Sequence, residues 1–209
     1  MEQALIEKFV DLQEEEVLKT VRQMIEGDAD PQNILNACQK AMVMIGEKFE
    51  EGVYFVSDLM MAGNIFKQVS EIVRPISQTG STTSLLDKVV IGTVAGDIHD
   101  IGKNLVVGLL EANNYEVYDL GIDQKNEIFI DKVKETGASV LALSGLLTVA
   151  FDSMKETIAL LEEEGLRDKV KVMIGGGTID QGVCKITGAD GWGANAQVAV
   201  NLCREWIGG

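Results

Sequence analysis

The sequence is poor in several residue types that carry chemistry: its 209 residues include one histidine, two prolines and three cysteines. The cysteines form no CxxC pair and His99 belongs to no HExxH motif, so the usual zinc patterns are missing. No GxSxG motif accompanies the histidine, which argues against a Ser-His-Asp hydrolase. Any imidazole chemistry in this chain depends on His99 alone.

Positive charge and long apolar runs are also scarce. The 18 Lys and Arg against 33 Asp and Glu give a net charge of −15, whereas nucleic acid requires a basic face. The richest apolar stretch, 140–151, is interrupted by Ser144, Gly145 and Thr148 and falls short of the roughly 20 residues that span a bilayer. The acidic N-terminus has no signal-peptide pattern, and the scattered cysteines form no disulfide framework. We expect a cytoplasmic protein that binds neither nucleic acid nor a membrane.

The residues that are present are ordinary for a packed globular chain, with 46% apolar and 24% charged residues, and they fall into two parts. Apolar residues within 1–77 recur every three or four positions, as on the buried face of a helix. Asp30 and Pro31 are predicted to start one helix as its N-cap and first residue, and Ser57 is expected to cap another. Three or four helices joined by short loops predict a helical bundle.

After a small, polar linker the pattern changes to β-branched segments that alternate with helical ones. The predicted strands are 88–94, 116–120, 139–143, 170–174 and 190–192, and the predicted helices are 102–113, 126–136, 151–164, 180–187 and a last one ending near 206. This alternation predicts a doubly wound α/β sheet of five parallel strands. The chain then consists of a helical domain (1–77), a linker (78–87) and an α/β domain (88–209).

Ligands of an open α/β sheet bind at the carboxyl ends of the strands, where this chain carries His99 and the glycine run 175–177. The histidine loop has no GxGxxG motif. Its Gly96–Gly102 spacing is one residue too long for a P-loop, and Asn104 replaces the Ser or Thr. An aspartyl-phosphate receiver would need a paired acidic cluster, which is missing. Flavin binding stays open on fold grounds alone.

The same loop contains an Asp-x-His-x-x-Gly pattern, formed by Asp97, His99 and Gly102. A neutral imidazole can bind a metal through one nitrogen while a nearby carboxylate takes the other N–H and fixes the tautomer. A single histidine is enough when a macrocycle supplies the remaining ligands of the metal. The pattern fits cobalt held in a corrin ring.

The sequence resembles the cobalamin-binding domains of methionine synthase and of the corrinoid proteins of anaerobic methyltransferase systems, over nearly its whole length. The matching segments are 97–104 (DIHDIGKN), 119–121 (DLG), 144–148 (SGLLT), 175–176 (GG) and, in the helical half, 46–52 (GEKFEEG) and 58–60 (DLM). The resemblance implies a flavodoxin-like α/β domain that binds cobalamin and is preceded by a four-helix bundle acting as a cap.

The resemblance also implies roles for single residues. His99 is expected to be the lower axial ligand of cobalt, in place of the cofactor's own base, with Asp97 as its hydrogen-bond partner and Ser144 next in the relay. The displaced nucleotide tail is expected to enter a slot beside the sheet. The residues expected to bind the cofactor are Asp97, Ile98, His99, Asp100, Ile101, Gly102, Ser144, Leu146, Thr148, Gly175, Gly176 and Ala196, with Phe49, Val56 and Leu59 over the upper face of the corrin.

The function that this resemblance implies is that of a non-catalytic methyl carrier in anaerobic one-carbon metabolism. It would take a methyl group from a donor-specific methyltransferase and deliver it to an acceptor methyltransferase that serves tetrahydrofolate or a thiol coenzyme. A reductive activase is the third expected partner. The alternatives are the cobalamin subunit of a mutase, which resembles the α/β half, and a cobalamin-dependent sensor, which usually carries a DNA-binding segment. A flavin-binding electron carrier remains if no corrinoid binds.

Overall fold

The computed structural model describes residues 1–77, 86–113 and 115–207. The chain divides into two compact units, Met1–Ser84 and Leu85–Gly209. Of the predicted linker, 78–85 lies outside the described residues, whereas residues 86 and 87 belong to the first strand, β1 (Leu86–Thr93). Among the described helices, none is long and apolar enough to cross a membrane.

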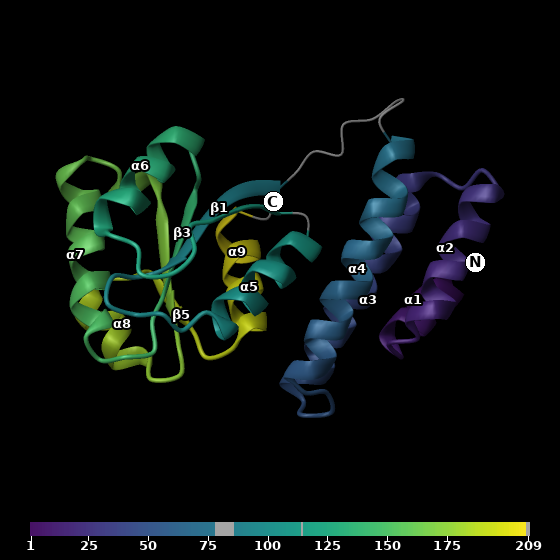
Figure 1. Ribbon diagram of the computed structural model, residues 1–209, viewed down its shortest axis with the longest axis horizontal. Helices are drawn as coiled ribbons and strands as arrows, with labels where there is room; N and C mark the ends of the chain where they lie inside the picture. Colours follow the sequence, from purple (N-terminus) through teal and green to yellow (C-terminus); the bar gives the residue numbers. More distant parts are fainter. Residues whose placement is uncertain (78–85, 114, 208–209) are drawn as a thin grey trace. The chain divides into compact units, whose positions relative to one another are not determined.

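The first unit is a bundle of the helices α1 (Glu2–Val10), α2 (Glu14–Glu26), α3 (Pro31–Glu50) and α4 (Val56–Ser77) (Figure 1). Its core is built from side chains at the predicted helical spacing, including Val17, Val21, Met24, Ile34, Cys38, Ala41, Ile45, Leu59, Ala62, Phe66, Val69 and Val73. The carboxylate of Asp30 accepts a hydrogen bond from the amide of Gln32 at 2.9 Å, and Pro31 follows as the first helical residue, as predicted. The predicted four-helix bundle is confirmed.

The prediction that Ser57 caps α4 is wrong, because the helix already begins at Val56. Oδ2 of Asp58 instead accepts a hydrogen bond from the amide of Phe55 at 2.7 Å. A carboxylate in the first turn thus takes a backbone N–H that the helix itself leaves without a partner.

The second unit is a parallel sheet with the strand order β2-β1-β3-β4-β5, the doubly wound, flavodoxin-like arrangement that the sequence predicted. Its other strands are β2 (Tyr115–Asp119), β3 (Val140–Ser144), β4 (Lys171–Gly175) and β5 (Gly191–Gly193). The α-helices are α5 (Ile101–Ala112), α6 (Asn126–Thr136), α7 (Ala150–Glu163), α8 (Gln181–Thr187) and α9 (Ala196–Ile207), with a short 3₁₀ turn, η1 (Arg167–Lys169), before β4. Helices α5 and α9 cover one face of the sheet, and α6, α7 and α8 cover the other (Figure 1).

The strand register brings four loops together at the carboxyl edge of the sheet. Thr93 of β1 pairs with Ser144 of β3, Ser144 with Gly175 of β4, and Gly175 with Gly193 of β5. The central strand β3 is buried on both faces, as expected for a strand between two helical layers. Because these four residues form one row, the loops that follow β1, β3, β4 and β5 start side by side.

Each unit also buries free thiols. Cys38 lies in the core of the bundle, whereas Cys184 and Cys203 lie in the α/β unit, and the side chains of all three are buried. Burial raises the pKa of both Cys38 and Cys203 to about 12. The three cysteines are therefore packing residues rather than reactive thiols.

Candidate functional site

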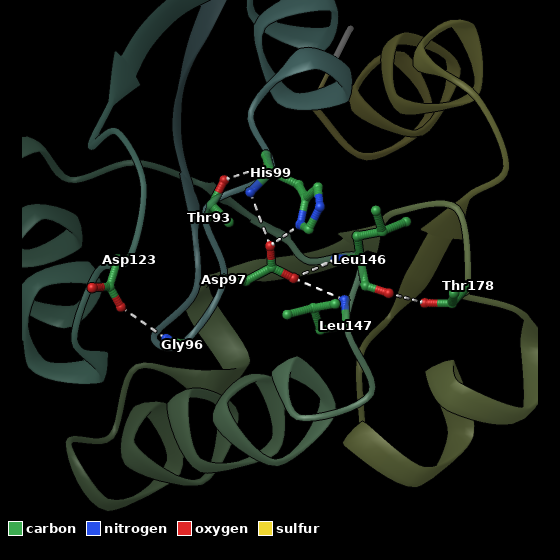
Figure 2. Close-up of polar contacts among 8 residues, drawn as sticks. All are labelled: Thr93, Gly96, Asp97, His99, Asp123, Leu146, Leu147 and Thr178. Atoms are coloured by element: carbon green, nitrogen blue, oxygen red, sulfur yellow. Dashed lines mark hydrogen bonds and ion pairs between the residues drawn. The ribbon is translucent and has the colours of Figure 1, made fainter.

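The loop between β1 and α5 holds a buried carboxylate directly against the only histidine. Asp97 is completely buried, and its Oδ1 lies 2.7 Å from Nδ1 of His99 and accepts a hydrogen bond from the His99 amide at 2.9 Å (Figure 2). An ionised carboxylate only accepts hydrogen bonds, so Nδ1 of the ring is the donor. This fixes the neutral imidazole in the tautomer whose Nε2 carries the lone pair.

The second oxygen of Asp97 is held by the loop that follows β3. Oδ2 accepts hydrogen bonds from the amides of Leu146 at 2.6 Å and Leu147 at 2.9 Å (Figure 2). Burial by itself raises the pKa of Asp97, but the hydrogen bonds from Leu147, His99 and Leu146 outweigh it and lower the pKa to about 2. The carboxylate is therefore ionised throughout the physiological pH range.

The imidazole of His99 stands at the surface of the α/β unit, and its side chain is 49% exposed. The buried hydroxyl of Thr93 donates a hydrogen bond to the carbonyl oxygen of His99 at 3.1 Å, which fixes the backbone behind the ring. Ile98 and Ile101 flank the histidine in sequence and are 67% and 77% exposed. An exposed imidazole flanked by apolar side chains suits a metal carried inside a large organic ring.

A cavity of about 180 Å³ opens between the sheet and the α5–α9 layer. Its floor comes from β1, β3, β4 and β5, and its walls from the start of α5, the first turn of α9 and the loops after β4 and β5. The residues that line it are Ile91, Gly102, Lys103, Val106, Ala142, Leu143, Ser144, Met173, Ile174, Gly175, Gly176, Gly177, Gly193, Ala194, Asn195, Ala196 and Ala199. We call this cavity the slot; most of its lining is glycine, alanine or aliphatic, which leaves room for a planar, largely apolar group.

The loops after β3 and β4 touch at a point where only glycine fits. Gly176 has φ +150°, and a Cβ on it would lie 1.8 Å from the carbonyl oxygen of Gly145. The hydroxyl of Thr178 donates to the carbonyl oxygen of Leu146 at 2.6 Å (Figure 2). The loop after β4 thereby supports the two amides that hold Asp97.

The structure places the predicted residues in three groups. Asp97 and His99 form the hydrogen-bonded pair, with Ile98, Asp100 and Ile101 exposed around them. The predicted residues in the slot lining are Gly102, Ser144, Gly175, Gly176 and Ala196. Leu146 and Thr148, which the resemblance assigns to the slot, are not part of its lining; Leu146 binds Asp97 through its amide, and Thr148 is exposed.

The relay expected from Ser144 differs from the hydrogen bonding of the described residues. The Asp97 carboxylate accepts bonds from His99, Leu146 and Leu147, and none from the Ser144 hydroxyl. The backbone amides of Leu146 and Leu147 take the place that the Ser144 hydroxyl was expected to fill. Ser144 itself lines the slot.

The three expected cap residues lie in the helical unit. Leu59 is a core residue of the bundle and only 1% exposed, because it lies on the buried face of α4. Val56 is 44% exposed and Phe49 is half-buried. Their role toward a ligand stays a prediction.

Several residues in and around the slot are not among those predicted from the sequence. Lys103, Met173 and Asn195 line the slot, and Thr178 supports the loop after β3. Lys103 was within the matched segment 97–104, so its place one residue after Gly102 was the available signal. The amides of Leu146 and Leu147 gave no signal, since every residue other than proline has a backbone N–H.

Comparisons with known proteins agree with this geometry. Models of B12 binding domains match residues 1–74 and 87–201. A dimethylamine corrinoid protein of Methanosarcina barkeri is 36% identical over 206 residues, which are 98% of this chain and 96% of that protein.

Solved structures of similar proteins extend over the same length. A cobalamin-binding protein from Desulfitobacterium hafniense is similar with a TM-score of 0.85 and 38% identity, covering 99% of this chain and 98% of that one. A chain of the methanol:cobalamin methyltransferase complex from Methanosarcina barkeri is similar with a TM-score of 0.84 and 28% identity, covering 98% and 78%. This chain belongs to the B12-binding family of corrinoid proteins.

Proposed function

We propose that this protein is a non-catalytic methyl carrier that binds cobalamin through His99, with the cofactor's own base displaced. The observation that carries the proposal is the pairing of Asp97 with His99. The carboxylate holds Nδ1 at 2.7 Å, while the side chain of the histidine is half-exposed. Nε2 is therefore the nitrogen available to a metal, in a tautomer that is fixed in advance.

The residues of the α/β unit fit the cofactor in its chemistry and in its shape. Nε2 of His99 would bind the cobalt, and the exposed Ile98 and Ile101 would offer apolar contacts to the ring. The slot would take the displaced nucleotide tail, since its glycine and alanine lining lets a flat group approach the backbone closely. In the described part of the chain, no group of three His, Cys, Asp or Glu is arranged to hold a bare metal ion.

When bound, the cobalt of the cofactor supplies the nucleophile that accepts a methyl group and later gives it up. The chain contributes control of the imidazole. With the pKa of Asp97 lowered to about 2, the carboxylate stays charged and the shared proton stays on Nδ1. A charged partner on Nδ1 makes the ring a better ligand for a metal at Nε2.

The expected partners are methyltransferases. The names of the similar proteins refer to dimethylamine and methanol, which supports a small methylated donor presented by a donor-specific methyltransferase. We further propose an acceptor methyltransferase serving tetrahydrofolate or a thiol coenzyme, and a reductive activase. The free, buried Cys38, Cys184 and Cys203 support a reducing cytoplasm as the location.

The proposal is tested by absorption spectra of the full chain reconstituted with cobalamin. Wild type is expected to shift the cofactor to a form in which protein nitrogen replaces its own base, and His99→Ala is expected to lose that coordination. Ile186→Ala, an exposed position on α8 outside the slot, is the control and should match wild type. Identical spectra for wild type and His99→Ala would contradict the proposal. Methyl transfer with methyltransferases for dimethylamine and for methanol then identifies the donor.

A further inference from the structure

Asp123, in the loop between β2 and α6, is hydrogen-bonded to the turn that carries Asp97. Its Oδ1 accepts a hydrogen bond from the amide of Gly96 at 2.8 Å (Figure 2), and its own amide donates to the carbonyl oxygen of Asp97 at 3.1 Å. The next residue adds a further hydrogen bond, because the amide of Gln124 donates to the carbonyl oxygen of Thr93 at 3.0 Å. One short segment thus binds the chain immediately before and at Asp97.

The backbone of Asp123 adopts a strained conformation that allows these hydrogen bonds. Its φ is +52°, in the left-handed region where residues other than glycine are strained and where Asn and Asp are tolerated best. Glycine would adopt this φ more easily, but it has no side chain to accept the bond from Gly96. Gly96 itself has φ +81°, a conformation that glycine adopts without strain, so its backbone is less restricted than that of other residues.

We propose that Asp123 is a positioning residue that holds the Asp97 carboxylate against the imidazole and so sets the tautomer of His99. The 2.7 Å contact between Oδ1 of Asp97 and Nδ1 requires the 96–97 backbone to stay in place. This backbone is hydrogen-bonded to Asp123 through the Gly96 amide and the Asp97 carbonyl oxygen. The amide of Asp97 also donates to the carbonyl oxygen of Val94 at 3.2 Å. The consequence for cobalt rests on the proposed function, whereas the consequence for the tautomer does not.

The single imidazole of the chain makes the tautomer directly measurable by ¹⁵N NMR of the full chain without cofactor, at alkaline pH. Asp123→Gly removes the acceptor and relieves the backbone. Asp123→Asn keeps an acceptor oxygen and tolerates the same φ. Asp28→Gly is the matched control, since Asp28 is an exposed aspartate with φ +55° in the helical unit.

Wild type, Asp123→Asn and Asp28→Gly are expected to show the Nδ1–H form, and Asp123→Gly a mixture of both tautomers. Partners that orient a metal-bound histidine typically change metal affinity by about 10- to 100-fold. Because Asp123 acts one step further away, we expect Asp123→Gly to bind cobalamin about three- to tenfold more weakly. An Asp123→Gly chain with the wild-type tautomer and wild-type affinity would overturn the proposal. If no variant, wild type included, binds cobalamin, the proposed function fails while the tautomer still decides on Asp123.

A measurement on wild type covers the case in which Asp123→Gly does not fold. Gly96 is exposed, and within the described residues its amide donates to Oδ1 of Asp123, so that bond is what should protect it. Its hydrogen exchange should be at least about tenfold slower than that of an unprotected amide. Exchange at the unprotected rate would overturn the proposal without any variant.

Discussion

The ammonium nitrogen of Lys103 lies 2.6 Å from Oδ2 of Asp119, and the Lys103 side chain is 2% exposed while that of Asp119 is 34% exposed. Nζ also donates to Oδ1 of Asn104 at 2.7 Å, and Oδ1 of Asp119 accepts from the amide of Gly121 at 2.9 Å. The pair joins the first turn of α5, which lines the slot, to the end of β2. A buried cation therefore fixes one wall of the proposed nucleotide site.

Removing the two partners of this pair should have unequal costs. Asp119→Asn leaves a buried ammonium opposite a neutral amide, and we expect the free energy of unfolding to fall by about 1–3 kcal/mol, less than for a fully buried pair because Asp119 is partly exposed. Lys103→Met removes the buried charge and leaves Asp119 to water, so its loss should be smaller. Urea unfolding of both variants measures the difference, and a larger loss for Lys103→Met would refute the argument.

The depressed pKa of Asp97 predicts a specific loss of stability in acid. The native pKa is about 2 against an ordinary value of 3.8, so the stabilisation is complete above the unfolded value and is lost as the pH falls through the native one. Asp97→Asn cannot show this dependence. The gap in unfolding free energy between wild type and Asp97→Asn should therefore narrow between about pH 4 and pH 2, as followed by urea titration. A gap that stays constant over that window would show that Asp97 is not held as an ionised acceptor.

Two glycines of α5 separate helix stability from slot volume. A Cβ on Gly102 or on Gly108 would meet no atom within 4 Å, so alanine at either position should fold and stabilise the helix by up to about 1 kcal/mol. Only Gly102 lines the slot. Gly102→Ala should therefore weaken cobalamin binding, while Gly108→Ala should leave it unchanged. Calorimetric titration checks both, and equal affinities would mean that the nucleotide tail does not enter past Gly102.

The two neighbouring glycines after β4, Gly176 and Gly177, should tolerate substitution very differently. Alanine at Gly176 would place its Cβ 1.8 Å from a backbone oxygen, whereas alanine at Gly177 would meet the flexible end of Leu146 at 3.1 Å. We expect Gly176→Ala to cost more than about 3 kcal/mol or to prevent folding, and Gly177→Ala to cost about 1 kcal/mol or less. Thermal unfolding of the two variants provides the comparison, and similar midpoints would contradict the close approach of the two loops.

The sequence was sufficient for features that repeat with a period or depend on one residue type. The helical spacing predicted the bundle core, and the alternation of β-branched and helical segments predicted the five strands to within one or two residues. The pair of Asp97 and His99 is predictable because the single histidine of the chain stands two positions after an aspartate.

Features that depend on tertiary contacts were not predictable. The partners of the second Asp97 oxygen are amides about 50 residues away, and no side-chain type marks them. Residue type favours Ser57 as a cap, but the carboxylate that binds a free amide at the start of α4 is that of Asp58, one residue later. An apolar side chain such as Leu59 suits both a ligand contact and a helical core, so the sequence does not distinguish the two. Its 1% exposure in the structure places it in the bundle core.

The separate burial of Cys38 and Cys203 places in each unit a thiol whose rate of chemical modification reports local opening of that unit. Because both thiols have a pKa of about 12 and no access to water, an alkylating reagent reaches either sulfur only when the surrounding layer of helices has opened. The modification rates at the two positions therefore report the local opening of the bundle and of the α/β unit separately. A partner that opens only the bundle would raise the modification rate at Cys38 and leave that at Cys203 unchanged.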